Sequence, residues 1–189
     1  IIDGKKLLPV KRTIADSIPE GYKMMRKALA NRADSSVVII TVGFATNLSR
    51  LLNSQPDEFS ELNGIDLIKK KVKLLSIMSG TYNDDTFNNP EWNVLQDLKA
   101  AQNVYNNWPT EVIASGSEVG VRILYPHESV LNDYPGGEKY PLCVSYKSYE
   151  QMPYDRPCWD LTSVLYAIEP ENSHLNISPK GKITIDLSL

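Results

Sequence analysis

Amide and acidic side chains crowd into one short stretch of the chain, directly after an apolar run that ends at Met78. Within eleven positions the stretch holds Asn83, Asp84, Asp85, Asn88, Asn89, Glu91 and Asn93. Carboxylates accept hydrogen bonds from hydroxyl groups, and amides both donate and accept them. This density predicts a site for a polyhydroxylated ligand such as a sugar. A solvated loop that uses Asn and Asp for its turns is the alternative.

A second candidate is Asp160, which stands just before the apolar positions of a late helical pattern. A carboxylate at the start of a helix normally caps free backbone N–H groups. The apolar neighbours Cys158 and Trp159 predict partial burial instead, and a buried carboxylate needs a hydrogen-bonding partner or a cation. Both interpretations of Asp160 remain open at this point.

The cysteines and histidines exclude several other kinds of site. Cys143 and Cys158 are too few and too far apart for a disulfide framework or a zinc site. The two histidines, His127 and His174, share no ligand spacing. We therefore expect any metal to be a hard ion that is held by oxygen atoms.

Short β-branched runs and amphipathic segments alternate along most of the chain, and these elements must position the polar residues. The apolar runs predict strands buried on both faces at 37–43, 74–78 and 111–115. Helical spacing predicts helices at about 19–32, 48–52, 62–72, 94–108, 119–124 and 157–168. This order predicts an α/β fold with an open, mostly parallel sheet and helices on both faces. Ligands of such sheets bind at the carboxyl ends of the strands.

The rest of the chain predicts one domain over residues 1–189 and a C-terminal β-hairpin over 176–185. With a net charge of −3, and Lys69–Lys71 as the one basic cluster, the chain lacks the electrostatic footprint of a nucleic-acid-binding protein. No run approaches the roughly 20 apolar residues that a membrane span needs. We expect neither a nucleic acid nor a membrane as partner.

Four segments at the predicted strand ends and at the late helix resemble the inosine-uridine-preferring nucleoside hydrolase family. They are TVGFATNL at 41–48, IMSG at 77–80, PEWN at 90–93 followed by Asp97, and WD at 159–160. Their order and separations agree with the family along nearly the whole chain from about residue 18. Members are calcium-dependent glycosidases with a Rossmann-like fold that cleave the N-glycosidic bond of ribonucleosides in nucleoside salvage.

The resemblance implies a role for each matching residue. Thr46 would give its backbone carbonyl, and Asp160 its carboxylate, to a calcium ion. The residues implied to contact the ribose are Met78, Glu91, Asn93 and one of Asn83, Asn88 and Asn89. The substrate would be a small-molecule ribonucleoside, and a homo-oligomer is compatible with this assignment. The reacting ribosyl centre would have oxocarbenium character and be attacked by a metal-activated water molecule.

Two departures from the family pattern matter. The family carries an N-terminal aspartate cluster, D-x-D-x-G-x-D-D, which supplies most calcium ligands and the general base, and this chain has no such cluster. We therefore expect the chain to be the carboxyl-terminal part of a nucleoside hydrolase-like domain, without a general base. Many members also have His where Trp159 stands. An indole cannot protonate a leaving base at neutral pH, but it can stack on one or pack in the core.

Three functions remain open on the sequence alone. The first is hydrolysis of ribonucleosides by the complete protein. The second is a non-catalytic module that binds nucleosides or sugars, and the third is an inactive fragment. Cytoplasmic and exported locations are both compatible with the composition.

Overall fold

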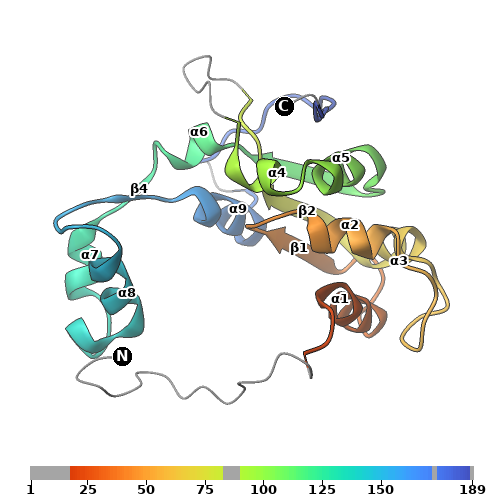
Figure 1. The fold of residues 1–189 in the computed structure, drawn as a ribbon, viewed down its shortest axis with the longest axis horizontal. Helices are drawn as coiled ribbons and strands as arrows, with labels where there is room; N and C mark the ends of the chain where they lie inside the picture. Colours follow the sequence, from red (N-terminus) through yellow and green to blue (C-terminus); the bar gives the residue numbers. More distant parts are fainter. Residues whose placement is uncertain (1–17, 83–89, 172–173, 188–189) are drawn as a thin grey trace. The chain divides into compact units, whose positions relative to one another are not determined.

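The computed structural model describes residues 18–82, 90–171 and 174–187, and the chain divides into two compact units (Figure 1). The larger unit is built from Glu20–Ile123 and Cys158–Leu189, and the smaller one is centred on Leu124–Pro157. That the whole chain is one domain stays a prediction.

A three-stranded parallel sheet in the order β1-β2-β3 forms the centre of the larger unit. Its strands are β1 (Val37–Thr41), β2 (Val72–Met78) and β3 (Glu111–Ser115). β1 begins at the residue that the apolar run predicts, and β3 spans the predicted residues. The parallel pairing confirms the α/β class. The carboxyl ends of β2 and β3 lie at the same edge of this sheet, so the polar segments that follow the two strands both start at that edge.

Helices cover both faces of the sheet (Figure 1). They are α1 (Gly21–Ala30), α2 (Thr46–Leu52), α3 (Gly64–Lys71), α4 (Trp92–Gln96), α5 (Leu98–Asn107), α6 (Ser117–Gly120) and α9 (Trp159–Ile168). Helices α1, α2, α3 and α5 bury their apolar residues against Leu75 and Ile77. On the opposite face, α9 contacts all three strands, and Ser76 Oγ donates a hydrogen bond to the Ser163 carbonyl at 2.8 Å. Successive strand residues face opposite sides, so Leu75 and Ser76 belong to different layers.

The expectation that every strand is buried on both faces is wrong for β1 and β3. β2 is almost wholly buried, whereas β1 and β3 are mostly half-buried, and Ile40 in β1 is 40% exposed. In the described part of the sheet, β1 and β3 each pair with β2 alone. A β-branched composition indicates a strand, but it does not decide whether that strand is central.

Two of the predicted helices differ in the structure. The helix predicted at 94–108 is broken at Asp97, whose φ of −155° lies outside the helical region, and the Asp97 carboxylate instead caps α5 by accepting from the Ala100 amide. The helix predicted at 119–124 is also wrong, because α6 ends at Gly120. By contrast, α1, α3 and α9 lie within their predicted ranges, and α2 begins two residues before its predicted start and ends where predicted. Lys69–Lys71 occupy the last turn of α3 as a helix terminus.

The predicted C-terminal hairpin is wrong, because residues 174–187 contain no strand in the structure. Ile185 instead packs against the core of the larger unit, and its carbonyl accepts a hydrogen bond from Gln102 Nε2 at 3.1 Å. A two-stranded hairpin is marginal without further packing, and Pro179 has no amide hydrogen to donate to a ladder. The contact with the core decides the path of this segment.

The smaller unit pairs two short antiparallel strands, β4 (Leu124–Tyr125) and β5 (Arg156–Pro157). Between them lie α7 (His127–Asn132), a short 3₁₀ helix (Gly137–Lys139) and α8 (Pro141–Tyr149). The rings of Tyr146 and Tyr154 stack at 4.4 Å, and each hydroxyl donates to the other residue's carbonyl. The sequence patterns predicted neither α7 nor α8, because both helices are short and their apolar residues form no clear stripe.

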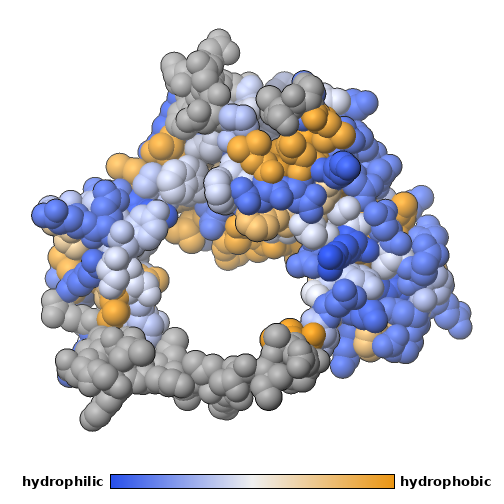
Figure 2. Space-filling view, viewed as in Figure 1, coloured by the Kyte–Doolittle hydropathy of each residue, from blue (hydrophilic) through white to orange (hydrophobic). Residues whose placement is uncertain are grey.

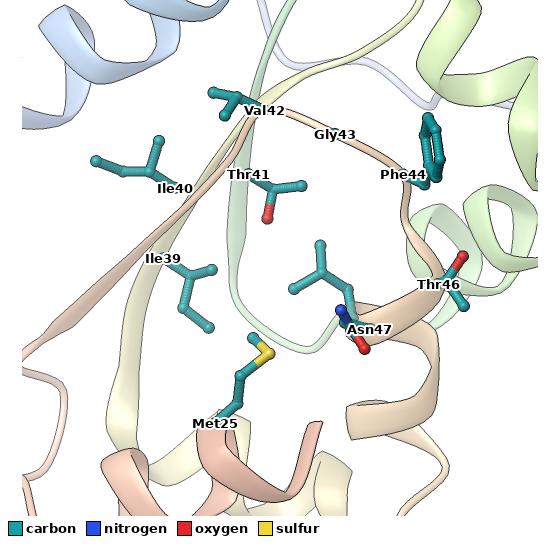
Figure 3. Close-up of a pocket in the computed structure, with 10 residues that line it drawn as sticks. Met25, Ile39, Ile40, Thr41, Val42, Gly43, Phe44, Thr46 and Asn47 are labelled. Atoms are coloured by element: carbon teal, nitrogen blue, oxygen red, sulfur yellow. The ribbon is translucent and has the colours of Figure 1, made fainter. Parts of the chain in front are cut away.

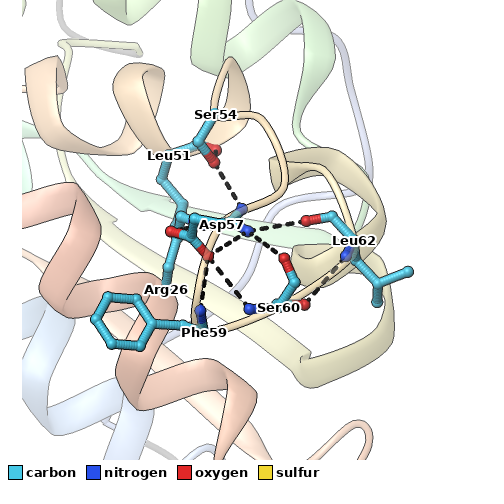
Figure 4. Close-up of polar contacts among 7 residues, drawn as sticks. All are labelled: Arg26, Leu51, Ser54, Asp57, Phe59, Ser60 and Leu62. Carbon is cyan, nitrogen blue, oxygen red and sulfur yellow. Dashed lines mark hydrogen bonds and ion pairs between the residues drawn. The ribbon is translucent and has the colours of Figure 1, made fainter.

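One buried charge is held inside the larger unit (Figure 4). The Arg26 guanidinium group, which is 0% exposed, forms two hydrogen bonds to the Asp57 carboxylate, at 2.7 and 2.9 Å. It donates further to Ser54 Oγ at 2.9 Å, to the Ser60 carbonyl at 3.0 Å and to the Leu62 carbonyl at 2.9 Å. These bonds tie the loop between α2 and α3 to α1.

The surface of the larger unit mixes hydrophilic and apolar side chains (Figure 2). Phe44, Trp92, Leu161 and Ile168 are among its most exposed large apolar residues. In the described part of the chain, no helix combines the length and the apolar character that a membrane crossing requires.

Candidate functional site

Met78, Glu91 and Asn93 come together at the carboxyl end of β2. Asn93 Nδ2 lies 3.3 Å from the Met78 carbonyl oxygen and 3.2 Å from its sulfur atom. Glu91 directly precedes α4, and Asn93 is the second residue of that helix. The structure thus places three of the sequence-predicted ribose contacts side by side, and their roles stay predictions.

Glu91 is buried, and its carboxylate is fixed by backbone amides. Oε1 accepts from the Asn93 amide at 2.8 Å, and Oε2 accepts from the amides of Val94 at 3.1 Å and Gly80 at 3.2 Å. A carboxylate oxygen has two lone-pair positions, so Oε1 retains the capacity for one more donor. Gly80 has a φ of +81°, a conformation that favours glycine, and this turn directs its amide to Glu91.

Glu118 is a candidate residue that the sequence analysis missed. It lies in α6 after the end of β3, is 5% exposed, and accepts from the Tyr82 amide through Oε1 at 3.1 Å. Its other oxygen, Oε2, is buried and has no hydrogen-bond partner in the part of the chain that the structure describes. The carboxylate folds over Gly116, where a Cβ atom would overlap it. Its position just after a strand end was the only sequence signal for this residue.

Two tyrosine hydroxyl groups lie beside these carboxylates. Tyr82 donates to the Ser79 carbonyl at 2.8 Å, and its hydroxyl oxygen lies 3.2 Å from that of Tyr105. Although the Tyr82 ring is 38% exposed, desolvation of its hydroxyl raises its pKa well above the usual range, with further contributions from Tyr105, Glu118 and Glu91. Burial also raises the pKa of Tyr105. Both hydroxyl groups therefore stay protonated at neutral pH beside two carboxylates.

The two candidate metal ligands, Thr46 and Asp160, occupy the first turns of different helices. Thr46 is the first residue of α2, and its hydroxyl donates to Asp97 Oδ2 at 2.6 Å. Asp160 follows Trp159 in the first turn of α9 and is exposed, so the expectation that it is partly buried is wrong. It is also not the N-cap, a position that Cys158 occupies. Two oxygen donors fall short of the six to eight that calcium takes, so these residues do not form a calcium site by themselves.

The remaining predicted contacts are Trp159 and the three asparagines. Trp159 packs tightly against Gly120, where any Cβ atom would overlap the backbone and ring of the tryptophan. Asn83, Asn88 and Asn89 lie outside the described residues. The packing of Trp159 therefore joins α9 to α6, next to the end of β3.

An open cavity of about 410 Å³ lies beside β1 and the turn that follows it (Figure 3). Met25, Ile39 and Phe44 give it an apolar lining, and Thr46 and Asn47 add polar groups. Of the predicted site residues that the structure describes, Thr46 alone lines it. The cavity is therefore distinct from the cluster of Met78, Glu91 and Asn93.

The fold and this cluster define an α/β protein with a polar candidate site at the carboxyl ends of its parallel strands. Comparison with protein families gives a match to the model described as inosine-uridine preferring nucleoside hydrolase, over residues 3–187. The chain belongs to this family, which confirms the resemblance found in the sequence. Membership supports a hydrolase function on a small-molecule nucleoside, and the family is generally metal-dependent. A comparison with curated proteins gives no match.

Proposed function

We propose that this chain supplies the ribose-recognition part of an N-ribohydrolase, which in complete form hydrolyses the N-glycosidic bond of ribonucleosides. The observation that carries the proposal is the position of Asn93 against Met78, beside the buried Glu91, at the carboxyl end of β2. This is the edge of a parallel sheet at which ligands bind. Family membership gives the nucleoside as substrate class.

The proposed chemistry follows from the groups that face this edge. Glu91 Oε1 accepts one hydrogen bond from the described residues and can accept a second from a ribose hydroxyl, and the Asn93 side-chain carbonyl can accept from another hydroxyl. A negative carboxylate near the sugar stabilises the positive charge that the ribosyl ring develops as the glycosidic bond breaks. Calcium, with Thr46 and Asp160 among its ligands, would supply an acidified water molecule. The general base does not come from this chain.

The first test measures whether the 189-residue chain binds ribonucleosides. Inosine and uridine binding is followed by saturation-transfer NMR and calorimetry, with calcium present. Replacing Asn93 by Ala, which leaves the Glu91 carboxylate and its backbone contacts in place, should weaken binding about tenfold or more, the scale of a hydrogen bond to a buried polar group. Asn31→Ala, an exposed amide at the end of α1, is the matched control and should bind like wild type. Equal affinities in both variants would contradict the proposal.

The second test separates the enzyme from a non-catalytic binding module. We expect the 189-residue chain alone to release ribose far more slowly than about 1 per second, the lower range of ordinary enzymes, because its calcium ligands are too few. Ribose release from inosine and uridine is measured with calcium and after chelation. Turnover at an ordinary rate would show that the described residues already suffice for catalysis. Tight nucleoside binding that is indifferent to calcium would favour the binding module.

A further inference from the structure

His127 in the smaller unit stands between two carboxylates, one at each ring nitrogen. Nδ1 lies 2.7 Å from Asp155 Oδ1, and Nε2 lies 3.3 Å from Glu128 Oε1. His127 and Glu128 are the first two residues of α7, and Asp155 directly precedes β5. Within the described ranges, this is the one group of three His, Cys, Asp or Glu side chains close enough to share a metal ion. The sequence analysis considered only the spacing of the two histidines and the expectation of oxygen ligands, so it did not find this group.

Asp155 fixes both the position and the tautomer of the imidazole ring. Its Oδ1 accepts from the His127 backbone amide at 2.9 Å as well as from the ring. A carboxylate accepts hydrogen bonds and cannot donate them. Nδ1 must then carry the hydrogen atom. In the tautomer that binds a metal ion through Nε2, the lone pair of Nε2 lies on the side of Glu128 Oε1.

A metal ion between Nε2 and Glu128 Oε1 would accept a lone pair from each of these two atoms. A tetrahedral zinc ion with nitrogen and oxygen ligands at about 2.0–2.2 Å holds two such atoms roughly 3.3–3.5 Å apart. The observed separation is 3.3 Å. A carboxylate on the far nitrogen of a metal-bound histidine is the usual outer partner in such sites, and Asp155 occupies that place.

We propose that the smaller unit binds a divalent transition-metal ion of the zinc type through His127 Nε2 and Glu128 Oε1, with Asp155 orienting the ring. Water molecules complete the coordination, because Glu128 is exposed and the ring is partly open to solvent. An imidazole ligand favours zinc, copper or nickel over calcium. This site is therefore separate from the proposed calcium ligands Thr46 and Asp160, and it does not depend on nucleoside hydrolysis.

The test is calorimetric titration of the whole chain with zinc chloride, paired with the visible absorption of added cobalt(II). We expect one equivalent of zinc to bind to wild type, and calcium in excess not to compete. His127→Ala should abolish binding. Asp155→Asn, which keeps an oxygen for the backbone amide of His127, should weaken it about 10- to 100-fold. His174→Ala is the matched control and should bind like wild type.

Circular dichroism of each variant separates a lost ligand from a lost fold. Glu128→Gln changes an exposed side chain and should weaken zinc binding while the spectrum stays unchanged. The proposal is overturned if zinc does not bind, or if zinc affinity is the same in His127→Ala as in wild type. A His127 ring that only forms hydrogen bonds to the two carboxylates, and binds no metal, would give the first of these results.

Discussion

Two buried polar regions of the larger unit differ in how completely their hydrogen bonds are satisfied. Around Arg26, hydrogen bonds run from all three guanidinium nitrogens to acceptors in one loop, and Asp57 receives two of them (Figure 4). At the carboxyl ends of β2 and β3, Glu118 Oε2 is buried and has no hydrogen-bond partner among the described residues. Glu91 Oε1 accepts one hydrogen bond, from the Asn93 amide, and an oxygen of a carboxylate can accept two.

The comparison separates polar groups that hold the fold from polar groups that are available to a ligand. A buried network with every group paired fixes one conformation, as the Arg26 network fixes the loop between α2 and α3. Buried polar atoms without partners are rare in folded proteins and call for a specific explanation. Among the described residues there are two such atoms, Glu118 Oε2 and Ser163 Oγ. Ser163 lies inside α9, whereas Glu118 follows the end of β3, the edge of a parallel sheet at which ligands bind.

The largest expected effect comes from breaking the satisfied network. Replacing Arg26 by Met should lower the free energy of unfolding by about 3–5 kcal/mol, because the Asp57 charge loses its partner in a largely buried place. Urea denaturation measures the change. Arg50→Met is the matched control, since Arg50 pairs with Glu20 at 3.6 Å on the surface and should contribute no more than about 1 kcal/mol. If Arg26→Met and Arg50→Met lowered the free energy of unfolding by similar amounts, the Arg26 network would not be a main support of the fold.

Variants of Trp159 test whether the start of α9 holds the fold or is available to a ligand. If the indole ring stacks on the nucleobase, Trp159→Ala should lose about 1–3 kcal/mol of binding free energy, and Trp159→Phe should keep most of it. If its contact with Gly120 is its whole role, the loss appears in the melting temperature while nucleoside affinity stays unchanged. Both quantities are measured on the same two variants. Unchanged affinity in the alanine variant would remove Trp159 from the site.

In the wild-type chain, a low pH should weaken the hydrogen bonds between Arg26 and Asp57. The hydrogen bonds from Arg26, with those from the Phe59 and Ser60 amides, lower the pKa of Asp57 below its unfolded value of about 3.9. The stabilisation is therefore fully present above that unfolded pKa and is lost as the pH falls through the folded pKa. Asp57→Asn should flatten this part of the stability profile in urea titrations between pH 6 and pH 2. An unchanged slope would contradict the assignment.

The smallest expected change in stability is at the unsatisfied carboxylate. Glu118→Gln keeps an oxygen for the Tyr82 amide and replaces a buried charge by a neutral amide, which costs less to bury. The free energy of unfolding should rise or change by no more than about 1 kcal/mol. Urea denaturation beside Arg26→Met provides the comparison. A loss near that of Arg26→Met would show that Glu118 holds the fold and is not free for a ligand.

Local sequence patterns predicted much of the fold and part of the site. β-branched runs mark β1 and β3, and polar residues after β2 include Glu91 and Asn93, which the structure brings beside Met78. The break at Asp97 was missed because the apolar spacing continues through it, while the carboxylate caps the next helix. The hairpin failed because contact with the core outweighs the turn preference of Gly181.

The sequence by itself determined the α/β class, the family and the types of residue at the strand ends, because periodicity and short motifs are local properties of a chain. Only the tertiary structure decided that β2 is central and that Asp155 meets His127 from 28 positions away. It also decided that one Glu118 oxygen is buried with no partner among the described residues. These features depend on pairings between distant segments. Such pairings are set by the packing of the whole unit, and no local pattern records them.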